Sequence, residues 1–172
     1  HPLWRVGVNA DTLLALRAFI AAEMGGPRPP VAIGETGLDY YVPGCDAKHQ
    51  EEVFLAQLRL AREFDLPVLL HVRRAVDRVL SCLRRVRVRG GVAHAFNGSR
   101  QQADAFISLG FKLGFGGAMT YSGSVRIRRL AAELPLNSIV LETDAPDIPP
   151  GWQPTQRCEP VFLTRYAQVL AE

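Results

Sequence analysis

Four side chains able to bind a divalent metal ion follow short apolar runs of the sequence. They are Glu35, His71, His94 and Asp144. Hydrolytic metal sites mix histidine nitrogen with carboxylate oxygen and leave one position open for water. A single histidine at the end of an apolar strand is usually a hydrogen-bonded core or rim residue, but this explanation is harder to apply to four residues in one structural position. The pattern therefore predicts a hydrolytic metal site.

The elements that would position these residues follow a regular alternation. Short apolar runs alternate with segments of helical period, which is typical of successive parallel βα units whose strands are buried on both faces. We expect strands at residues 31–33, 68–70, 91–93, 111–115 and 139–141. We expect helices at about residues 11–23, 46–65, 75–85, 100–109, 124–134 and 159–171, with Asp46 as an N-cap.

This alternation allows an open doubly wound sheet or a closed (β/α)₈ barrel of the TIM type. A barrel gathers the carboxyl ends of its strands around one mouth, whereas an open sheet spreads them along a line. The four ligand-type residues therefore favour the barrel, and we expect them to converge at one rim. We treat residues 1–172 as a single domain of the α/β class.

Composition excludes several classes of protein. With 172 residues, 48% hydrophobic and 22% charged, the chain can bury a core and is not disordered. The net charge of +3 is too small to indicate nucleic-acid binding by itself. No apolar run approaches the roughly 18 residues of a membrane helix. The 3 cysteines, Cys45, Cys82 and Cys158, have no CxxC spacing, so a reducing cytoplasm fits best.

Longer motifs surround the candidate ligands. They are GETGLDYY at residues 34–41, HVR at 71–73, HAFNGS at 94–99 and ETDAP at 142–146. In order and context these motifs resemble the TatD-like metal-dependent deoxyribonucleases. His1-Pro2 is similar to the end of that family's third barrel strand, and RCEP at residues 157–160 is similar to its late RNEP segment.

The resemblance implies an amidohydrolase-type barrel that holds two divalent ions, Mg, Mn or Zn. It implies that Glu35 bridges the ions, that His71 and His94 complete one site, and that Asp144 binds the second ion and handles the proton of the attacking water. Glu35 and Asp144 are then the catalytic residues. The implied reaction is the hydrolysis of phosphodiester bonds in DNA, and the implied partner is nucleic acid rather than a membrane.

One departure from the family pattern bears on activity. The family's first strand carries a His-x-His pair for the second ion, and this chain contains no such pair. If His1 ends strand three, then strands one, two and most of three are missing, and the barrel is incomplete. We therefore expect exposed strand edges, weak metal binding at Glu35, His71 and His94, and poor turnover.

Three residues are candidates for contact with a substrate. Arg73 lies two residues after His71 and could clamp a phosphate or form a structural salt bridge. The amides near Ser99 could cradle a phosphate, or Ser99 could simply cap the next helix. Arg157 matches the late family segment, in which Cys158 replaces the usual asparagine.

Nearby aromatic and histidine side chains allow two interpretations. Tyr40 and Tyr41 could line a groove for single-stranded nucleic acid, although tyrosines at a barrel rim are more often packing residues. We do not expect His1, at the start of the chain, to be a ligand.

Two other functions stay open at this point. The same ligands could activate water against a small ester or amide. The absence of the His-x-His pair instead favours a noncatalytic protein that binds nucleic acid or a partner chain. The sequence gives no indication of the oligomeric state.

Overall fold

The computed structural model describes residues 1–3 and 7–172. Its contacts divide the chain into two compact units, His1–Val92 and Ala93–Glu172, and each is described by itself. The prediction of a single domain over residues 1–172 stays a prediction.

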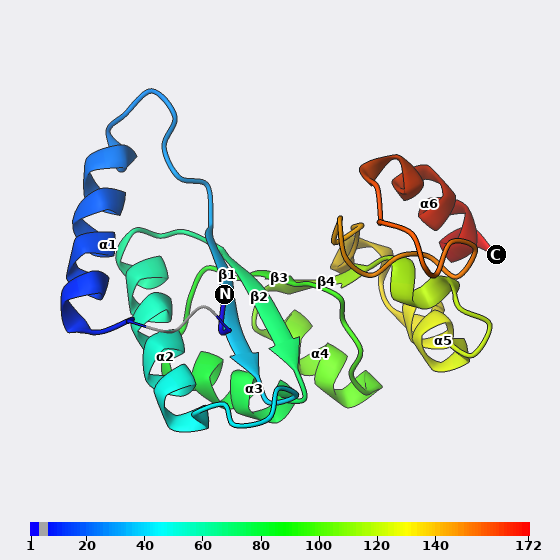
Figure 1. The fold of residues 1–172 in the computed structure, drawn as a ribbon, viewed down its shortest axis with the longest axis horizontal. Helices are drawn as coiled ribbons and strands as arrows, with labels where there is room; N and C mark the ends of the chain where they lie inside the picture. The colour runs from blue at the N-terminus through cyan, green and yellow to red at the C-terminus, as the bar shows by residue number, and fades with distance from the viewer. Residues whose placement is uncertain (4–6) are drawn as a thin grey trace. The chain divides into compact units, whose positions relative to one another are not determined.

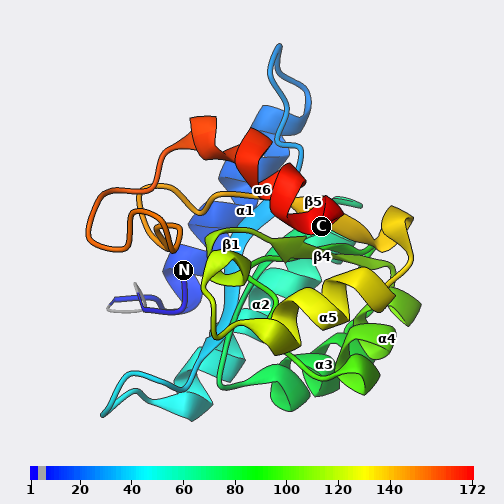
Figure 2. The ribbon, with the colours of Figure 1, turned by 90° about the vertical axis from the view of Figure 1, so that its right-hand side faces the viewer.

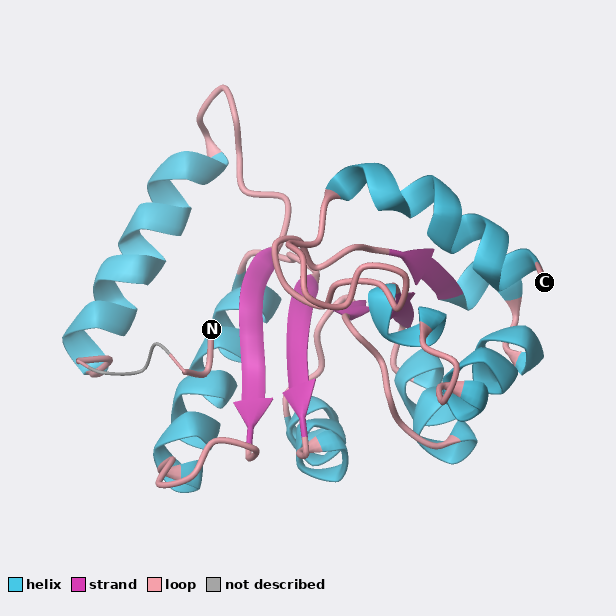
Figure 3. Cartoon of the chain, turned by 45° about the vertical axis from the view of Figure 1, so that its right-hand side comes forward, coloured by secondary structure: helices cyan, strands magenta, loops and turns pink. Residues whose placement is uncertain are grey.

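In residues 1–3 and 7–92, the described part of the first unit, parallel strands alternate with helices (Figure 1). In chain order they are α1 (Ala10–Met24), β1 (Ile33–Asp39), α2 (Ala47–Glu63), β2 (Val68–Arg73) and α3 (Val76–Arg85). The arrows of β1 and β2 run in the same direction in Figure 3, and Gly37 pairs with His71 in their register. Helix α2 packs on β1, where Phe54, Leu58 and Leu38 are fully buried.

The second unit contains strands β4 (Phe111–Phe115) and β5 (Ile139–Leu141), which pair in parallel. Its helices are α4 (Arg100–Ser108), α5 (Val125–Glu133) and α6 (Leu163–Ala171), with short 3₁₀ turns η1 (Gly117–Thr120), η2 (Leu136–Ser138) and η3 (Pro160–Phe162). Helices α5 and α6 contact each other (Figure 2). Phe106, Leu113, Phe115 and Tyr166 are buried in this unit.

Strand β3 (Gly91–Ala93) lies at the boundary between the units, and the order of hydrogen-bonded strands is β1-β2-β3-β4-β5. Parallel pairs with intervening helices confirm the α/β prediction. The predicted strands at residues 91–93, 111–115 and 139–141 have the predicted bounds, and each predicted helix is present within a few residues of its expected ends. The strand predicted at residues 68–70 continues to Arg73, so His71 lies inside it and not after its end.

The expectation for the first strand was wrong. It covers Ile33–Asp39 rather than residues 31–33, so Glu35 lies inside the strand and not at its carboxyl end. The apolar run misleads because Val31 is 81% exposed, and pairing begins where the Ile33 amide donates to the Pro67 carbonyl at 2.9 Å. The register with β2 then shifts between Ile33 and Thr36.

Two predicted helix caps are confirmed. The Asp46 carboxylate accepts from the His49 amide at 3.0 Å, and the Ser99 hydroxyl accepts from the Gln102 amide at 3.2 Å. Side-chain oxygens at these positions satisfy amides that the first turn of a helix leaves without partners.

Among the helices that the structure describes, we find none with the length and apolar character needed to cross a bilayer.

Candidate metal centre

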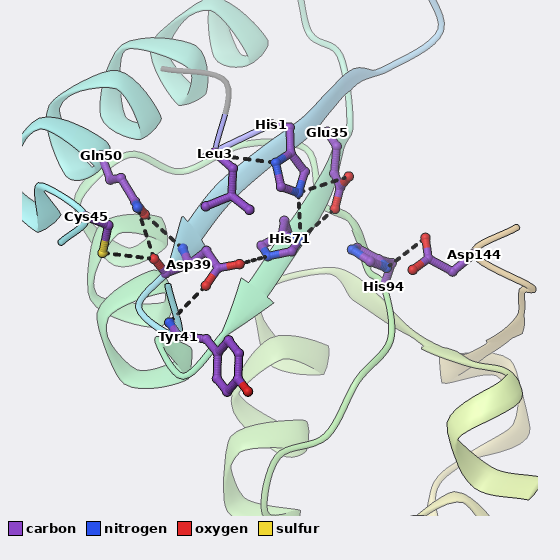
Figure 4. A network of polar contacts seen from close by, with 10 residues as sticks. All are labelled: His1, Leu3, Glu35, Asp39, Tyr41, Cys45, Gln50, His71, His94 and Asp144. Atoms are coloured by element: carbon purple, nitrogen blue, oxygen red, sulfur yellow. Dashed lines mark hydrogen bonds and ion pairs between the residues drawn. The ribbon is translucent and has the colours of Figure 1, made fainter. Parts of the chain in front are cut away.

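Three potential ligands from the first unit lie close together (Figure 4). The Nδ1 atom of His71, on β2, lies 2.9 Å from Oε1 of Glu35, on β1. The Nε2 atom of His1 lies 3.2 Å from the same His71 nitrogen and 3.8 Å from Oε2 of Glu35. All three side chains are partly buried, and one ligand atom from each lies within 4.8 Å of the others. Glu35 and His71 lie on β1 and β2, whereas His1 precedes the first helix and lies in no helix or strand.

The geometry and donor set of this cluster fit a divalent ion. Two ligand atoms that are each 2.0 to 2.1 Å from a tetrahedral ion lie about 3.3 Å apart. Nδ1 of His71 lies 2.9 Å from Oε1 of Glu35 and 3.2 Å from Nε2 of His1, and both separations are close to that value. Two imidazole nitrogens and one carboxylate also suit Zn or Mn. The cluster supplies three ligands and leaves a further coordination position for water.

A buried carboxylate holds the other side of the His71 ring. Asp39 is 0% exposed, and its Oδ2 atom lies 3.0 Å from Nε2 of His71. Its Oδ1 atom accepts from the Tyr41 amide at 2.9 Å. The Gln50 side chain accepts from the Asp39 N–H through Oε1 at 2.8 Å and donates to the Asp39 carbonyl through Nε2 at 3.0 Å. Nδ1 faces Glu35 and His1, so an ion bound at Nδ1 would leave the ring proton on Nε2, where the Asp39 carboxylate would accept it.

Close approach of the two strands at His71 requires a glycine. Gly37 has a φ of 148°, and a Cβ built there would lie 2.0 Å from the His71 carbonyl oxygen. Any larger residue would push β1 away from β2 at the level of the cluster. Gly37, the second glycine of the GETGLDYY motif, therefore fixes the distance between the strands that carry Glu35 and His71.

A second polar cluster lies in the second unit. The His94 Nδ1 atom lies 3.8 Å from Oε1 of Glu142 and 3.9 Å from Oδ1 of Asp144. The Glu142 carboxylate also accepts a hydrogen bond from the Ala95 amide. Asp144 follows β5 after two residues and has a φ of 56°, which turns the chain sharply. This cluster therefore contains two of the four predicted ligands, His94 and Asp144.

Burial changes the pKa of one tyrosine next to the first cluster. Tyr40 loses solvent, and the charge of Glu51 adds to this effect, so the pKa of its phenol is raised above 10.0. The phenol therefore keeps its proton at neutral pH and can donate a hydrogen bond, but it is not a base.

The structure brings the predicted residues together in two groups. Glu35 and His71 meet in the first unit, and His94 and Asp144 meet in the second. That all four converge at one rim stays a prediction.

The substrate candidates have different surroundings. Arg73 is exposed at the end of β2, and its guanidinium lies over the Tyr41 ring. The Ser99 side chain and amide take part in the capping box of α4, which confirms the capping alternative. Arg157 is exposed beside the buried Cys158, whose thiol contacts the Thr143 carbonyl at 3.3 Å. Contacts of Arg73, Ser99 and Arg157 with a substrate stay predictions.

Sequence reasoning missed three residues of these clusters: His1, Asp39 and Glu142. His1 was not expected to be a ligand, yet it lies in the first cluster. The signal for it was the similarity of His1-Pro2 to the end of a barrel strand. Asp39 and Glu142 stood in the quoted motifs, but no pattern in the sequence indicated their partners.

The fold and the clusters together define a protein of parallel βα units with a candidate divalent-metal centre formed by residues of two adjacent strands and by His1. The chain belongs to the TatD related DNase family, whose model matches residues 9–172. This finding confirms the resemblance to the TatD-like metal-dependent deoxyribonucleases.

Relatives in the family are named as metal-dependent hydrolases or nucleases. The chain is 43% identical over 147 residues to the uncharacterized metal-dependent hydrolase YjjV of Escherichia coli (strain K12), covering 85% of this chain and 57% of that protein. It is 36% identical over 180 residues to the 3'-5' ssDNA/RNA exonuclease TatD of Pantoea sp. (strain At-9b), covering 99% and 66%. The chain thus spans 57% and 66% of the lengths of these two relatives.

Solved structures agree with the fold. The crystal structure of YjjV, a TatD homolog from Escherichia coli K12, superimposes with a TM-score of 0.92 at 38% identity, covering 99% of this chain and 65% of that one. An uncharacterized amidohydrolase from Saccharomyces cerevisiae has a TM-score of 0.70 at 21% identity, covering 94% and 53%, and supports the fold alone. The chain therefore has the α/β fold of a partial TatD-type barrel.

Proposed function

We propose that the chain is a divalent-metal-dependent hydrolase that cleaves phosphodiester bonds in DNA. The observation that carries this proposal is the cluster of His1, Glu35 and His71, whose ligand atoms lie within 4.8 Å of one another. Membership of the TatD family and relatives named as ssDNA/RNA exonucleases support the choice of nucleic acid as substrate.

The proposal assigns ligand positions to Glu35, His71, His94 and Asp144, and adds His1 to them. Two ions, Mg, Mn or Zn, complete the proposed site. A divalent ion supplies Lewis acidity, which polarises a phosphoryl oxygen and makes water acidic enough to attack near neutral pH.

The chain's own residues supply the remaining steps. Asp39 fixes the ring of His71. Asp144 accepts the proton of the attacking water while the water oxygen forms its bond to phosphorus. The ester bond then breaks, and the departing oxygen takes up a proton from solvent. Arg73, Ser99 and Arg157 are the proposed contacts to the substrate.

We propose slow turnover by the 172 residues alone, because the family's His-x-His pair is not among them. The proposed compartment is the cytoplasm, which agrees with the three free thiols at Cys45, Cys82 and Cys158.

The proposal is tested with a labelled single-stranded oligonucleotide and added Mn²⁺ or Mg²⁺. We expect release of mononucleotides that EDTA abolishes and that E35Q lowers at least tenfold, since this change removes the charge of the central ligand. E52Q is the matched control, because Glu52 is an exposed residue of α2 that pairs with Lys48. We expect its rate to equal that of the unchanged chain.

Four results would contradict the proposal or a part of it. Cleavage that survives EDTA would exclude the metal centre. Hydrolysis of small esters or amides without release of nucleotides would indicate a different substrate class. Oligonucleotide binding that survives EDTA without any cleavage would indicate a noncatalytic protein. A rate equal to that of a full-length TatD exonuclease would contradict slow turnover.

A further inference from the structure

Two arginines lie over one tyrosine ring where β1 and β2 end. The Cζ atom of Arg73 lies 3.7 Å from the centre of the Tyr41 ring, and that of Arg74 lies 4.7 Å from it. Both distances are within the range of cation–π attraction, which is about 6 Å. Both arginines are exposed, and Tyr41 is 47% exposed. We call these three residues the Tyr41 platform.

The positive charge of the Tyr41 platform is not neutralised by carboxylates. Within the part of the chain that the structure describes, neither Arg73 nor Arg74 forms an ion pair, whereas Arg78 and Arg85 of α3 both pair with Glu51. A guanidinium that stacks on a ring uses its flat face, and its N–H groups point outward from its edge. The platform therefore presents two sets of donors that are free to bind an anion.

Backbone conformation at Arg74 supports a role in binding. Arg74 has a φ of 54°, in the left-handed region that glycine adopts much more readily than arginine. Local folding alone would favour glycine at this turn between β2 and α3. The guanidinium is instead present and lies over Tyr41.

Two observations place the Tyr41 platform close to the metal cluster. Arg73 lies two residues after His71 on β2, a separation of about 6.6 Å along a strand and on the same face. The Tyr41 amide donates to Asp39, whose other carboxylate oxygen faces His71 (Figure 4). An anion on the platform would therefore lie a short distance from a group held at His71.

We propose that the Tyr41 platform is a phosphate subsite for single-stranded nucleic acid. It would hold a backbone phosphate one or two nucleotides away from the phosphate at the metal cluster. Arg73 and Arg74 donate to the phosphate oxygens, and Tyr41 is a positioning residue that keeps both guanidinium groups in place. This inference rests on the proposed function, because it takes nucleic acid as the substrate.

The test measures binding in EDTA, where no turnover occurs. A fluorescein-labelled single-stranded dT oligonucleotide is titrated with the chain at several salt concentrations, and anisotropy gives the affinity. We expect R73A/R74G to weaken binding about tenfold at 50 mM salt and to reduce the salt slope by about 1.4, which is 0.7 for each lost contact. Glycine at position 74 keeps the left-handed backbone, so only the guanidinium is removed.

Matched controls separate this subsite from general charge. R84A/R87A removes the same charge from two exposed arginines near the end of α3, and we expect an unchanged salt slope. Y41F keeps the ring and should bind like the unchanged chain, whereas Y41L should lose most of the effect of the platform. Thermal melting of each variant confirms that it is folded.

An unchanged slope in R73A/R74G, an equal loss in R84A/R87A, or no measurable binding by the unchanged chain would each overturn the proposal. Its failure is distinguishable from failure of the proposed function, which is read from metal-dependent cleavage and its loss in E35Q. Binding with the expected slope but without cleavage would retain the subsite and overturn the hydrolase. Metal-dependent cleavage together with an unchanged salt slope in R73A/R74G would retain the hydrolase and overturn the subsite.

Discussion

Asp39 contacts the nitrogen of His71 that faces away from the metal cluster. Its side chain is completely buried and accepts from the Tyr41 amide and from Nε2 of His71. Gln50 fixes its backbone on the other side. Histidines that bind metals usually donate their second N–H to a carboxylate or carbonyl, which sets the tautomer and the orientation of the ring. The Asp39–His71 pair has this arrangement.

The substitution D39N tests this role, because it replaces one carboxylate oxygen of Asp39 by an NH₂ group. In D39N, the side-chain oxygen keeps the Tyr41 amide as its partner, so the NH₂ group faces Nε2 of His71 and donates to it. The ring proton of His71 is then on Nδ1, where Glu35 accepts it and where it blocks a ligand position. We expect metal affinity to fall 10- to 100-fold, a loss typical of such partners. Long-range ¹⁵N–¹H spectra of metal-free D39N should show the ring proton of His71 on Nδ1.

D46N is the matched control for this prediction. Asp46 caps α2, and asparagine caps a helix about as well as aspartate, so stability and metal affinity should not change. The chain has 4 histidines, so the ring signals can be assigned with H71Q. A proton that stays on Nε2 in D39N, together with unchanged metal affinity, would show that Asp39 does not select the tautomer.

At the scale of elements, two parallel strands make room for Glu142 by omitting a side chain. Gly114 on β4 pairs with Val140 on β5, and a Cβ at Gly114 would lie 2.2 Å from Oε2 of Glu142. That carboxylate accepts from the Ala95 amide and faces His94. The absence of a side chain on β4 therefore allows Glu142 to hold the residues that follow β3.

G114A should displace the Glu142 carboxylate. Overpacking of a close site costs about 1–3 kcal/mol, and we expect the free energy of unfolding to fall by that amount. G123A is the matched control, because a Cβ at Gly123 meets nothing within 4 Å, and its effect should stay within about 0.5 kcal/mol. Urea unfolding measures both variants. Equal stability of the two would mean that Glu142 moves at no cost and does not need Gly114.

Elements were easier to predict from the sequence than contacts. The strands at residues 91–93, 111–115 and 139–141 match their apolar runs, because a buried parallel strand needs apolar residues on both faces. The first strand differed because Val31 is apolar but exposed, and pairing with β2 decides where the strand begins. The hydrophobicity of residues 31–33 does not indicate where pairing with β2 begins.

The candidate site was predictable only in part for the same reason. Glu35 and His71 stand out by residue type and by their place in βα units. The contact between His1 and His71 joins positions 70 residues apart, and no local pattern encodes it. Asp39 similarly lies in a recognisable motif, but nothing in the sequence indicates that its partner is His71, 32 residues away. Such partners follow from the register of β1 on β2, which depends on Gly37 and on the shift after Ile33.

On the scale of the whole molecule, potential ligands are distributed over both units. The first unit contains the cluster of His1, Glu35 and His71, which has three ligand atoms of its own. The second unit contains His94 and Asp144. The family resemblance predicts that His94 completes the site of Glu35 and His71. Whether the ion depends on one unit or on both is therefore a measurable property of the chain.

Metal binding should stabilise the folded chain by mass action. An ion that binds only the folded state at 100 times its Kd adds about 2.7 kcal/mol to the free energy of unfolding, and for a chain of this size that corresponds to a rise in Tm of about 5–10 °C. We expect this rise with Zn²⁺ or Mn²⁺, its reversal by EDTA, its loss in E35Q and its persistence in E52Q. H94Q should reduce the rise by at least half, because it removes a predicted ligand in the second unit. A full rise in H94Q would instead show that the first unit holds the ion by itself, and the ligand role of His94 would then be wrong.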